Sequence, residues 1–221
     1  MREFGRADES LAPVAQTLDG SFVSTLRGLA REHAMAIVAG MFEPTHDEHR
    51  VHNTLAVIGN DGRLAGAYRK LHLYDAFGIR ESDRFVPGTD GACVVSIAGH
   101  RIGFMTCYDL RFPELARALL DAGAELIAVP SAWYAGPMKE EHWSVLLRAR
   151  AIENTVFVAG VGQPAPIFVG RSRLVDPFGA ECVVLGDEEE LAVVDIDWSR
   201  LDDTRRRLPS LEHRRFDVRL R

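Results

Sequence analysis

The stretch of sequence that decides the fold reads IGFMTCYDLRFPEL, from Ile102 to Leu115. Its mostly apolar first part suits a buried strand that ends at Cys107, and Pro113 suits the first turn of a helix that we expect to run to about Asp121. Such a strand-to-helix turn can expose a thiol while backbone N–H groups face the same space, as acyl transfer requires. Position alone favours an inert cysteine, because free cysteine is among the most buried residue types. Cys107 is therefore a candidate nucleophile that needs further support.

Strand-like and helix-like segments alternate on both sides of this stretch. Helices are expected over 18–33 and 140–154. The turn sequence GNDG predicts a hairpin between strands 52–58 and 64–69, and a second hairpin joins 93–97 to 101–106. The remaining predicted strands are 35–41, 125–130, 156–162, 167–176, 181–185 and 190–196. Strands paired as hairpins between helices indicate a mixed α/β layered domain. Residues 71–91 form a long connection, and connections of this length are usually functional or partly structured.

The composition indicates a single globular domain over residues 1–221, with a charged tail from about 197 that can contact another subunit. The chain has 47% hydrophobic residues and a formal net charge of −6, which disfavours nucleic acid as a partner. No apolar run approaches the roughly 18 to 20 residues that cross a bilayer, and the first residues are charged rather than signal-like, so we expect a cytoplasmic protein that does not bind membranes. The three cysteines form no CxxC pair, which favours reduced thiols over disulfides or a zinc site.

The string CYDLRFPEL, residues 107–115, matches the cysteine motif of the nitrilase superfamily of carbon–nitrogen hydrolases residue for residue. The resemblance extends along the chain from about residue 18 to 196. It includes YRKLHL at 68–73, similar to the lysine motif of the family, and PSAW at 130–133, HW with LRARAIEN between 142 and 154, and DPFG at 176–179. The residues of these motifs look closest to those of the omega-amidase and deaminated-glutathione amidase branch.

This resemblance implies a four-layer α-β-β-α sandwich, pairing into homodimers or larger homo-oligomers, and chemistry without a metal or organic cofactor. It implies a Glu–Lys–Cys triad in which Cys107 is the nucleophile and Lys70 the neighbouring cation. Lys70 would favour the thiolate and hydrogen-bond the developing oxyanion together with the backbone amide of Tyr108. Glu81 stands where many members carry a second glutamate, which would orient Lys70 or position the substrate. The alternative for Glu81 is an ordinary loop carboxylate that faces water.

The implied reaction is hydrolysis of a non-peptide C–N bond in a small, linear, carboxylate-bearing amide, through an acyl-thioester on Cys107. Arg111 lies where some relatives hold a substrate carboxylate by a bidentate contact. The alternative for Arg111 is a structural salt bridge with Asp109 or Glu114. Trp133, with Tyr134, would form an apolar wall of the substrate site, and core packing is the alternative for both rings.

The remaining triad member is normally a glutamate in a Phe-Pro-Glu-like string, and no such string stands ahead of Lys70. Phe42-Glu43-Pro44 follows the strand after the first complete helix and lies too close to Lys70, and Glu3, just before Phe4-Gly5-Arg6, lacks a preceding strand. The family's first β-α-β unit, of about 30 or more residues, has no counterpart here. We therefore expect Met1 to be an internal methionine, and the chain without that unit to be poorly active and to expose unpaired strand edges and apolar surface.

Two other functions remain open at this point. A papain-like Cys–His hydrolase would use His72 or His142 as the partner of the thiol. A noncatalytic subunit or interaction protein would keep the fold alone. An in-frame Phe-Pro-Glu upstream of the Met1 codon would support the enzyme, and a stop codon there the noncatalytic protein. For His142 we expect a hydrogen-bonded structural role.

Overall fold

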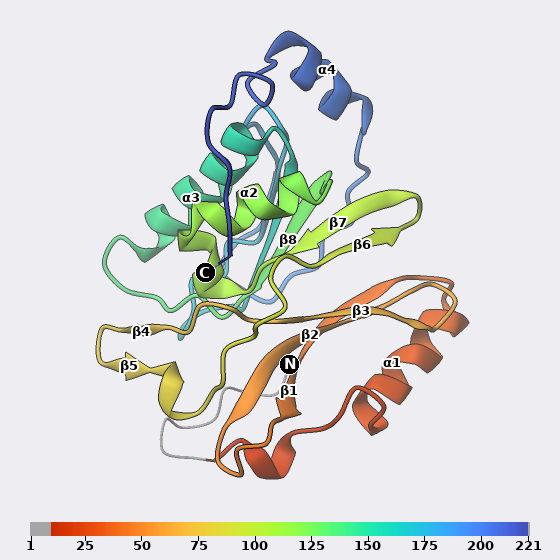
Figure 1. Cartoon of the computed structure of the whole chain (residues 1–221), viewed down its shortest axis with the longest axis vertical. Helices are drawn as coiled ribbons and strands as arrows, with labels where there is room; N and C mark the ends of the chain where they lie inside the picture. Colours follow the sequence, from red (N-terminus) through yellow and green to blue (C-terminus); the bar gives the residue numbers. More distant parts are fainter. Residues whose placement is uncertain (1–9, 221) are drawn as a thin grey trace. The chain divides into compact units, whose positions relative to one another are not determined.

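A computed structural model describes residues 10–220, and the contacts divide the chain into two compact units, Met1–Ala98 and Gly99–Arg221 (Figure 1). Glu3 and the segment Phe4–Arg6, both weighed for the missing glutamate, lie outside the described residues. No helix among residues 10–220 is long and apolar enough to cross a membrane.

In the first unit, one helix covers an antiparallel sheet with the strand order β1-β2-β3. The elements are α1 (Ser21–Glu32), β1 (Ile37–Pro44), β2 (Val51–Ile58) and β3 (Leu64–Arg69). The core between helix and sheet contains Val23, Ala30, Met41, Ala56 and Ile58. The predicted helix is confirmed but begins after Gly20, because the Gln16 side chain accepts a hydrogen bond from the Phe22 N–H at 2.8 Å and so caps the helix there.

The long connection after β3 is structured and folds back on the sheet. It contains the short strands β4 (Asp75–Ala76) and β5 (Ile79–Arg80) and a 3₁₀ turn, Glu81–Asp83. The N–H of Val51 donates to the Arg84 carbonyl at 3.0 Å, and that of Val86 to the Val51 carbonyl at 2.9 Å. The backbone of Lys70 is held on both sides, since its N–H donates to the Asn53 carbonyl and its carbonyl accepts from the Gly88 N–H, each at 2.9 Å. Strand β6 (Val94–Ile97) then contacts β3.

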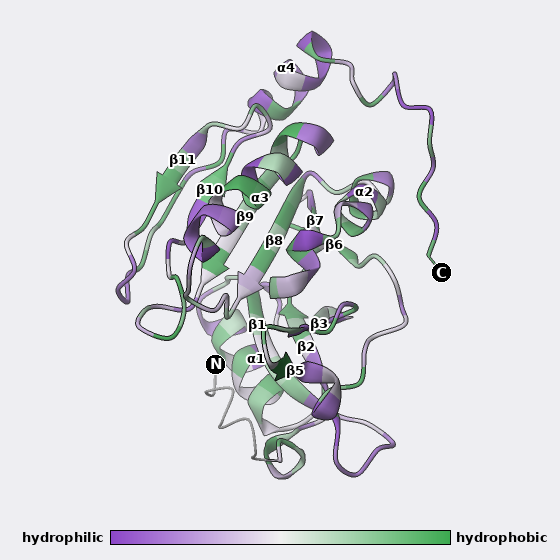
Figure 2. Cartoon of the chain, turned by 90° about the vertical axis from the view of Figure 1, so that its left-hand side faces the viewer, coloured by the Kyte–Doolittle hydropathy of each residue, from purple (hydrophilic) through white to green (hydrophobic). Residues whose placement is uncertain are grey.

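The second unit has a sheet with the strand order β11-β10-β9-β8-β7, in which β7, β8 and β9 are parallel and β10 and β11 antiparallel to their neighbours. Its helices α2 and α3 lie beside the sheet in Figure 2. The strands are β7 (His100–Phe104), β8 (Leu126–Ser131), β9 (Phe157–Gly162), β10 (Arg173–Val175) and β11 (Glu181–Val184). The helices are α2 (Pro113–Asp121), α3 (Lys139–Asn154) and α4 (Ser199–Arg207), with a 3₁₀ turn at Cys107–Arg111.

Two sequence expectations in this unit need correction. The strand expected over 167–176 shrinks to Arg173–Val175, and the strand expected over 190–196 is wrong, because that segment has no regular structure. Its Leu191 and Val193 are 90% and 91% exposed, so β-propensity without a pairing partner does not make a strand. The charged tail contains helix α4, whose Leu201 packs against Phe157 and Leu174. The sequence did not predict this helix, because its many charged residues leave only a short apolar stripe.

The packing of α3 on β9 depends on the missing side chain of Gly160. A methyl group there would lie 2.4 Å from Leu147 and 2.7 Å from Trp143, two fully buried side chains. We expect Gly160→Ala to lower the free energy of unfolding by about 1–3 kcal/mol through overpacking, measured by urea denaturation. Gly28→Ala in α1 is the matched control: nothing lies within 4 Å of its added methyl, so helix propensity should leave stability unchanged or raised. Equal effects at both positions would contradict this account of the packing.

Candidate active site

Cys107 opens the 3₁₀ turn that follows β7 and has a backbone φ of 51°, in the left-handed region that only glycine adopts freely. Holding a non-glycine residue there costs of the order of 1–3 kcal/mol, and such strain clusters at functional sites. The half-buried thiol donates to the Ala132 carbonyl at the end of β8, at 3.7 Å. The turn that the sequence predicted at the strand end therefore exists, and it imposes an unusual backbone on the cysteine.

Reciprocal hydrogen bonds between Thr106 and Asp109 hold this turn. The Thr106 N–H donates to the fully buried carboxylate of Asp109 at 2.9 Å, and the Asp109 N–H donates to the Thr106 carbonyl at 3.1 Å. The side chain of Tyr108, next to the cysteine, packs edge-on against Phe112 with the ring centroids 5.2 Å apart. Sequence reasoning missed the role of Asp109, although a Thr-x-x-Asp spacing just before Pro113 signals such a cap.

Arg111 lies at the end of the same turn, between a ring face and an imidazole. Its guanidinium carbon is 4.8 Å from the ring centroid of Trp133, and its Nη2 is 3.2 Å from Nδ1 of His142 in α3. A guanidinium has no acceptor, so Nδ1 accepts and the ring hydrogen of a neutral His142 sits on Nε2. The predicted hydrogen-bonded His142 is found, and its partner is Arg111. The contacts with Trp133 and His142 hold the guanidinium plane in one orientation.

Trp133 belongs both to the core and to this cluster. It is 4% exposed, its Nε1 donates to the Lys139 carbonyl at 2.9 Å, and its ring lies 5.5 Å from that of Trp143. Tyr134 instead packs against Phe168, with the ring centroids 5.2 Å apart. The second unit thus brings Cys107, Tyr108, Arg111 and Trp133 to the ends of β7 and β8.

Lys70 and Glu81 form a buried ion pair in the first unit. The lysine side chain is 1% exposed, and its Nζ lies 2.5 Å from Oε2 of Glu81, whose side chain is 10% exposed. The same oxygen accepts the Tyr74 N–H at 2.7 Å. The alternative for Glu81, an ordinary loop carboxylate that faces water, does not describe this buried pair. Burial of both charges requires such a pairing, because an unpaired charge in this place would be strongly unfavourable.

Glu43, from the Phe-Glu-Pro string rejected on sequence order, is engaged elsewhere in the first unit. Its carboxylate accepts hydrogen bonds from Arg69, through Nε at 2.8 Å and Nη2 at 2.6 Å, and from the Thr54 hydroxyl at 2.9 Å. Burial would raise the pKa of Glu43, but the bonds from Arg69 and Thr54 and the charges of Arg69 and His52 outweigh it and lower this pKa. Glu43 therefore has a structural role, and its carboxylate is a poor proton acceptor.

The other two thiols have environments that disfavour the thiolate. Burial, with a smaller contribution from the charge of Asp90, raises the pKa of Cys93. Partial burial and then Asp176 raise the pKa of Cys182, against weaker opposing effects of Arg200. Because the thiolate is the reactive form, both cysteines should be poor nucleophiles at neutral pH.

Comparison with known proteins gives one consistent result. The sequence model described as "Carbon-nitrogen hydrolase" matches residues 4–206, across both units. The deaminated glutathione amidase of Escherichia coli O157:H7 is 39% identical over 202 residues, covering 91% of this chain and 76% of that protein. Human omega-amidase NIT2 is 33% identical over 217 residues, covering 92% and 76%.

Solved structures agree. The protein XC1258 from Xanthomonas campestris, described as a CN-hydrolase superfamily protein with an arsenic adduct in the active site, superposes with a TM-score of 0.85 at 30% identity, covering 95% of this chain and 80% of that one. The predicted mixed α/β class and the resemblance to the nitrilase superfamily are both confirmed. This chain belongs to the carbon–nitrogen hydrolase family of enzymes, whose members named above include amidases.

Proposed function

We propose that the protein hydrolyses small, linear, carboxylate-bearing amides with Cys107 as the nucleophile. The observation that carries this proposal is the left-handed backbone of Cys107 at the end of a parallel strand, within the cysteine motif of an amidase family. The Cys107 sulfur attacks the amide carbon, the C–N bond breaks, and the proton lost by the thiol is transferred to the leaving nitrogen, which departs as ammonia. Water then hydrolyses the acyl-thioester, which releases the carboxylic acid and restores the thiol.

Lys70 and Glu81 have defined tasks in this proposal. The Lys70 ammonium stabilises the thiolate and then the oxyanion, together with the Tyr108 N–H. Glu81 is a positioning residue, since its carboxylate holds Lys70 at 2.5 Å while the Tyr74 N–H fixes the carboxylate. Preorganised charges of this kind need no rearrangement during the reaction, which is the main source of their catalytic value.

The primary test is selective labelling of Cys107, because the resemblance assigns no residue of this sequence to the proton-accepting glutamate. Chloroacetamide carries an amide next to an alkylating carbon and should modify Cys107 faster than Cys93 or Cys182, as measured by peptide mass spectrometry. Ammonia release from a panel of dicarboxylic monoamides is the second readout. Uniform slow labelling of all thiols, together with no ammonia release, would favour the noncatalytic alternative.

Arg111 is proposed to bind the carboxylate of the substrate. Trp133 and His142 hold its guanidinium without neutralising the charge, which leaves donors for a bidentate contact. We expect Arg111→Gln to raise, by about tenfold or more, the glutarate concentration that half-protects Cys107 from chloroacetamide. Protection by the uncharged butyramide should not change in this variant. A variant that loses both protections equally would show that Arg111 supports the turn rather than the carboxylate.

We also propose a cytoplasmic homodimer or larger homo-oligomer, acting as a single carbon–nitrogen hydrolase domain. Exposed apolar side chains support an interface that includes the tail: Leu191 at 90%, Val193 at 91% and Phe216 at 88% exposure. Light scattering coupled to gel filtration tests the assembly, and a monomer at all accessible concentrations would contradict it.

A further inference from the structure

A polar cavity that is open to solvent lies in the first unit, at the turn between β1 and β2. Its volume is about 560 Å³, within the range of small-molecule sites. We call it the turn cavity, and its lining consists of Glu43, Pro44, Thr45, His46, Asp47, Arg50, His52, Arg69 and Val86. None of these residues has a task in the reaction proposed above.

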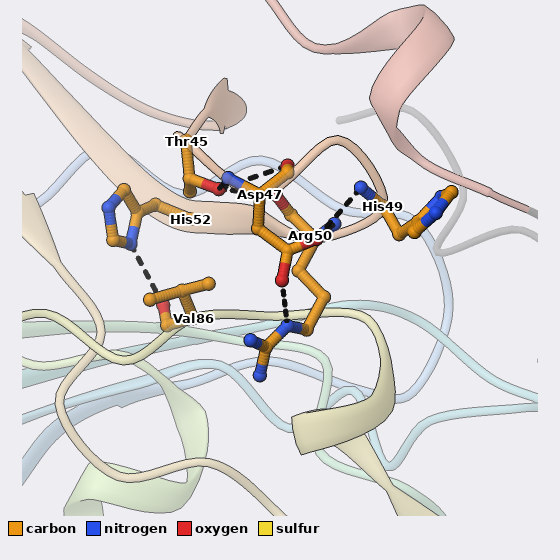
Figure 3. A network of polar contacts seen from close by, with 6 residues as sticks. All are labelled: Thr45, Asp47, His49, Arg50, His52 and Val86. Carbon is orange, nitrogen blue, oxygen red and sulfur yellow. Dashed lines mark hydrogen bonds and ion pairs between the residues drawn. The ribbon is translucent and has the colours of Figure 1, made fainter.

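The turn itself is fixed before any ligand arrives (Figure 3). Oδ1 of Asp47 accepts the N–H groups of His49 at 2.9 Å and Arg50 at 3.2 Å, and its Oδ2 accepts Nε of Arg50 at 2.7 Å. The Thr45 hydroxyl donates to the Arg50 carbonyl at 2.7 Å and accepts the Asp47 N–H at 3.0 Å. These bonds hold the Arg50 side chain by its Nε and leave the terminal nitrogens to project from the turn.

The two carboxylates of the turn cavity are occupied by the protein's own donors. Both carboxylate oxygens of Glu43 accept from Arg69, and both of Asp47 accept from the turn or from Arg50. By contrast, the terminal nitrogens of Arg50 donate to no residue in 10–220, and the side chain is 42% exposed, so a ligand can reach them. A cavity with spare guanidinium donors and engaged carboxylates favours a ligand rich in acceptors, which means an anion.

His52 adds a second polar side chain, only one of whose ring nitrogens is hydrogen-bonded within the described residues. Its Nδ1 lies 2.8 Å from the Val86 carbonyl, which can only accept, so Nδ1 carries a hydrogen (Figure 3). Its Nε2 then has no hydrogen-bond partner among the described residues. In a protonated ring this nitrogen is a second donor for an anion, and in a neutral ring it accepts from water. His52 stands directly opposite Glu43 in the β1–β2 register, on the same wall as the Arg69 ion pair.

From these contacts we propose that the turn cavity binds the oxyanion of a small molecule, a carboxylate or a phosphate, through the terminal nitrogens of Arg50 with the His52 ring beside it. The planar guanidinium presents two parallel N–H groups to two oxygens of the anion. Both kinds of oxyanion share this recognition, so the choice between them is left to measurement.

The test is a titration of the isotope-labelled protein with sodium glutarate and, separately, with sodium phosphate at constant ionic strength. We expect one or both to shift the backbone amide resonances of His49 and Arg50 saturably. Arg50→Gln should raise the dissociation constant about tenfold or more, and Arg50→Lys, which keeps the charge without the fork, by less. Arg63→Gln is the matched control, since Arg63 is 86% exposed in the other turn of the same sheet and does not line the cavity.

The same titration of the Arg111→Gln protein separates this site from the proposed substrate site, because binding at the turn cavity should persist there. Glutarate binding alone identifies a carboxylate site, phosphate alone a phosphate site, and binding of both a general oxyanion site. Saturable shifts in neither titration up to about 50 mM, a concentration well above the millimolar affinities of weak small-molecule sites, would overturn the proposal. So would a dissociation constant that Arg50→Gln leaves unchanged while its amide spectrum shows a folded protein.

Discussion

Replacing Cys107 with alanine should abolish both amide hydrolysis and selective alkylation, with a loss of about a thousandfold or more in any rate that the unmodified protein shows. The reason is that the acyl-thioester needs a sulfur at this position, and removal of a nucleophile from an acyl-transfer site leaves only the contribution of binding and the oxyanion donors. Ammonia release and peptide mass spectrometry measure the two effects. Alanine keeps the Cβ atom, so the cost of the φ of 51° is the same in both proteins, and in denaturation the variant should lose only the small packing contribution of the sulfur.

Cys93→Ala is the control for this prediction. Its thiol is partly buried, with a pKa that burial raises, so its removal should leave both rates unchanged. A Cys107→Ala protein that keeps its ammonia release would refute the proposed nucleophile, whatever the labelling shows. If release falls with Cys93→Ala instead, the family motif has been assigned the wrong task in this chain.

The turn around Cys107 was predictable because its determinants are local. A strand, a cysteine and a proline six residues later are enough to place the thiol at a strand end and to start α2 at Pro113. The contact between Arg111 and His142 was not predictable, because these residues are far apart in sequence. They meet only when the turn Cys107–Arg111 packs against α3, and no local pattern reports how two such elements are placed.

The errors have the same origin. The segment 190–196 has the apolar residues of a strand, yet a strand forms only where a neighbouring strand accepts its hydrogen bonds. Helix α4 has too few apolar residues to stand out, yet Leu201 finds a place in the core beside Phe157. Local propensity predicted most elements of the chain, and pairing partners decided the rest.

The buried pair of Lys70 and Glu81 leads to the other large expected effect. Lys70→Met should leave the Glu81 carboxylate buried without its cation, and we expect the free energy of unfolding to fall by about 3–5 kcal/mol. Glu81→Gln should cost a similar amount, because it leaves a buried ammonium whose side chain is 1% exposed. Urea denaturation of each variant measures these losses. A loss near zero for either would mean that the side chain left behind reaches water.

The double variant Lys70→Met with Glu81→Gln separates stability from chemistry. Since it removes both charges, it should be far more stable than the sum of the single losses predicts, by several kcal/mol of coupling. Its labelling and hydrolysis should nevertheless stay as low as those of Lys70→Met, because the ammonium that stabilises the thiolate is still missing. A Cys–His hydrolase relying on His72 or His142 would instead recover activity together with stability. Recovery of stability without recovery of reactivity is therefore the result that assigns the cation of the reaction to Lys70.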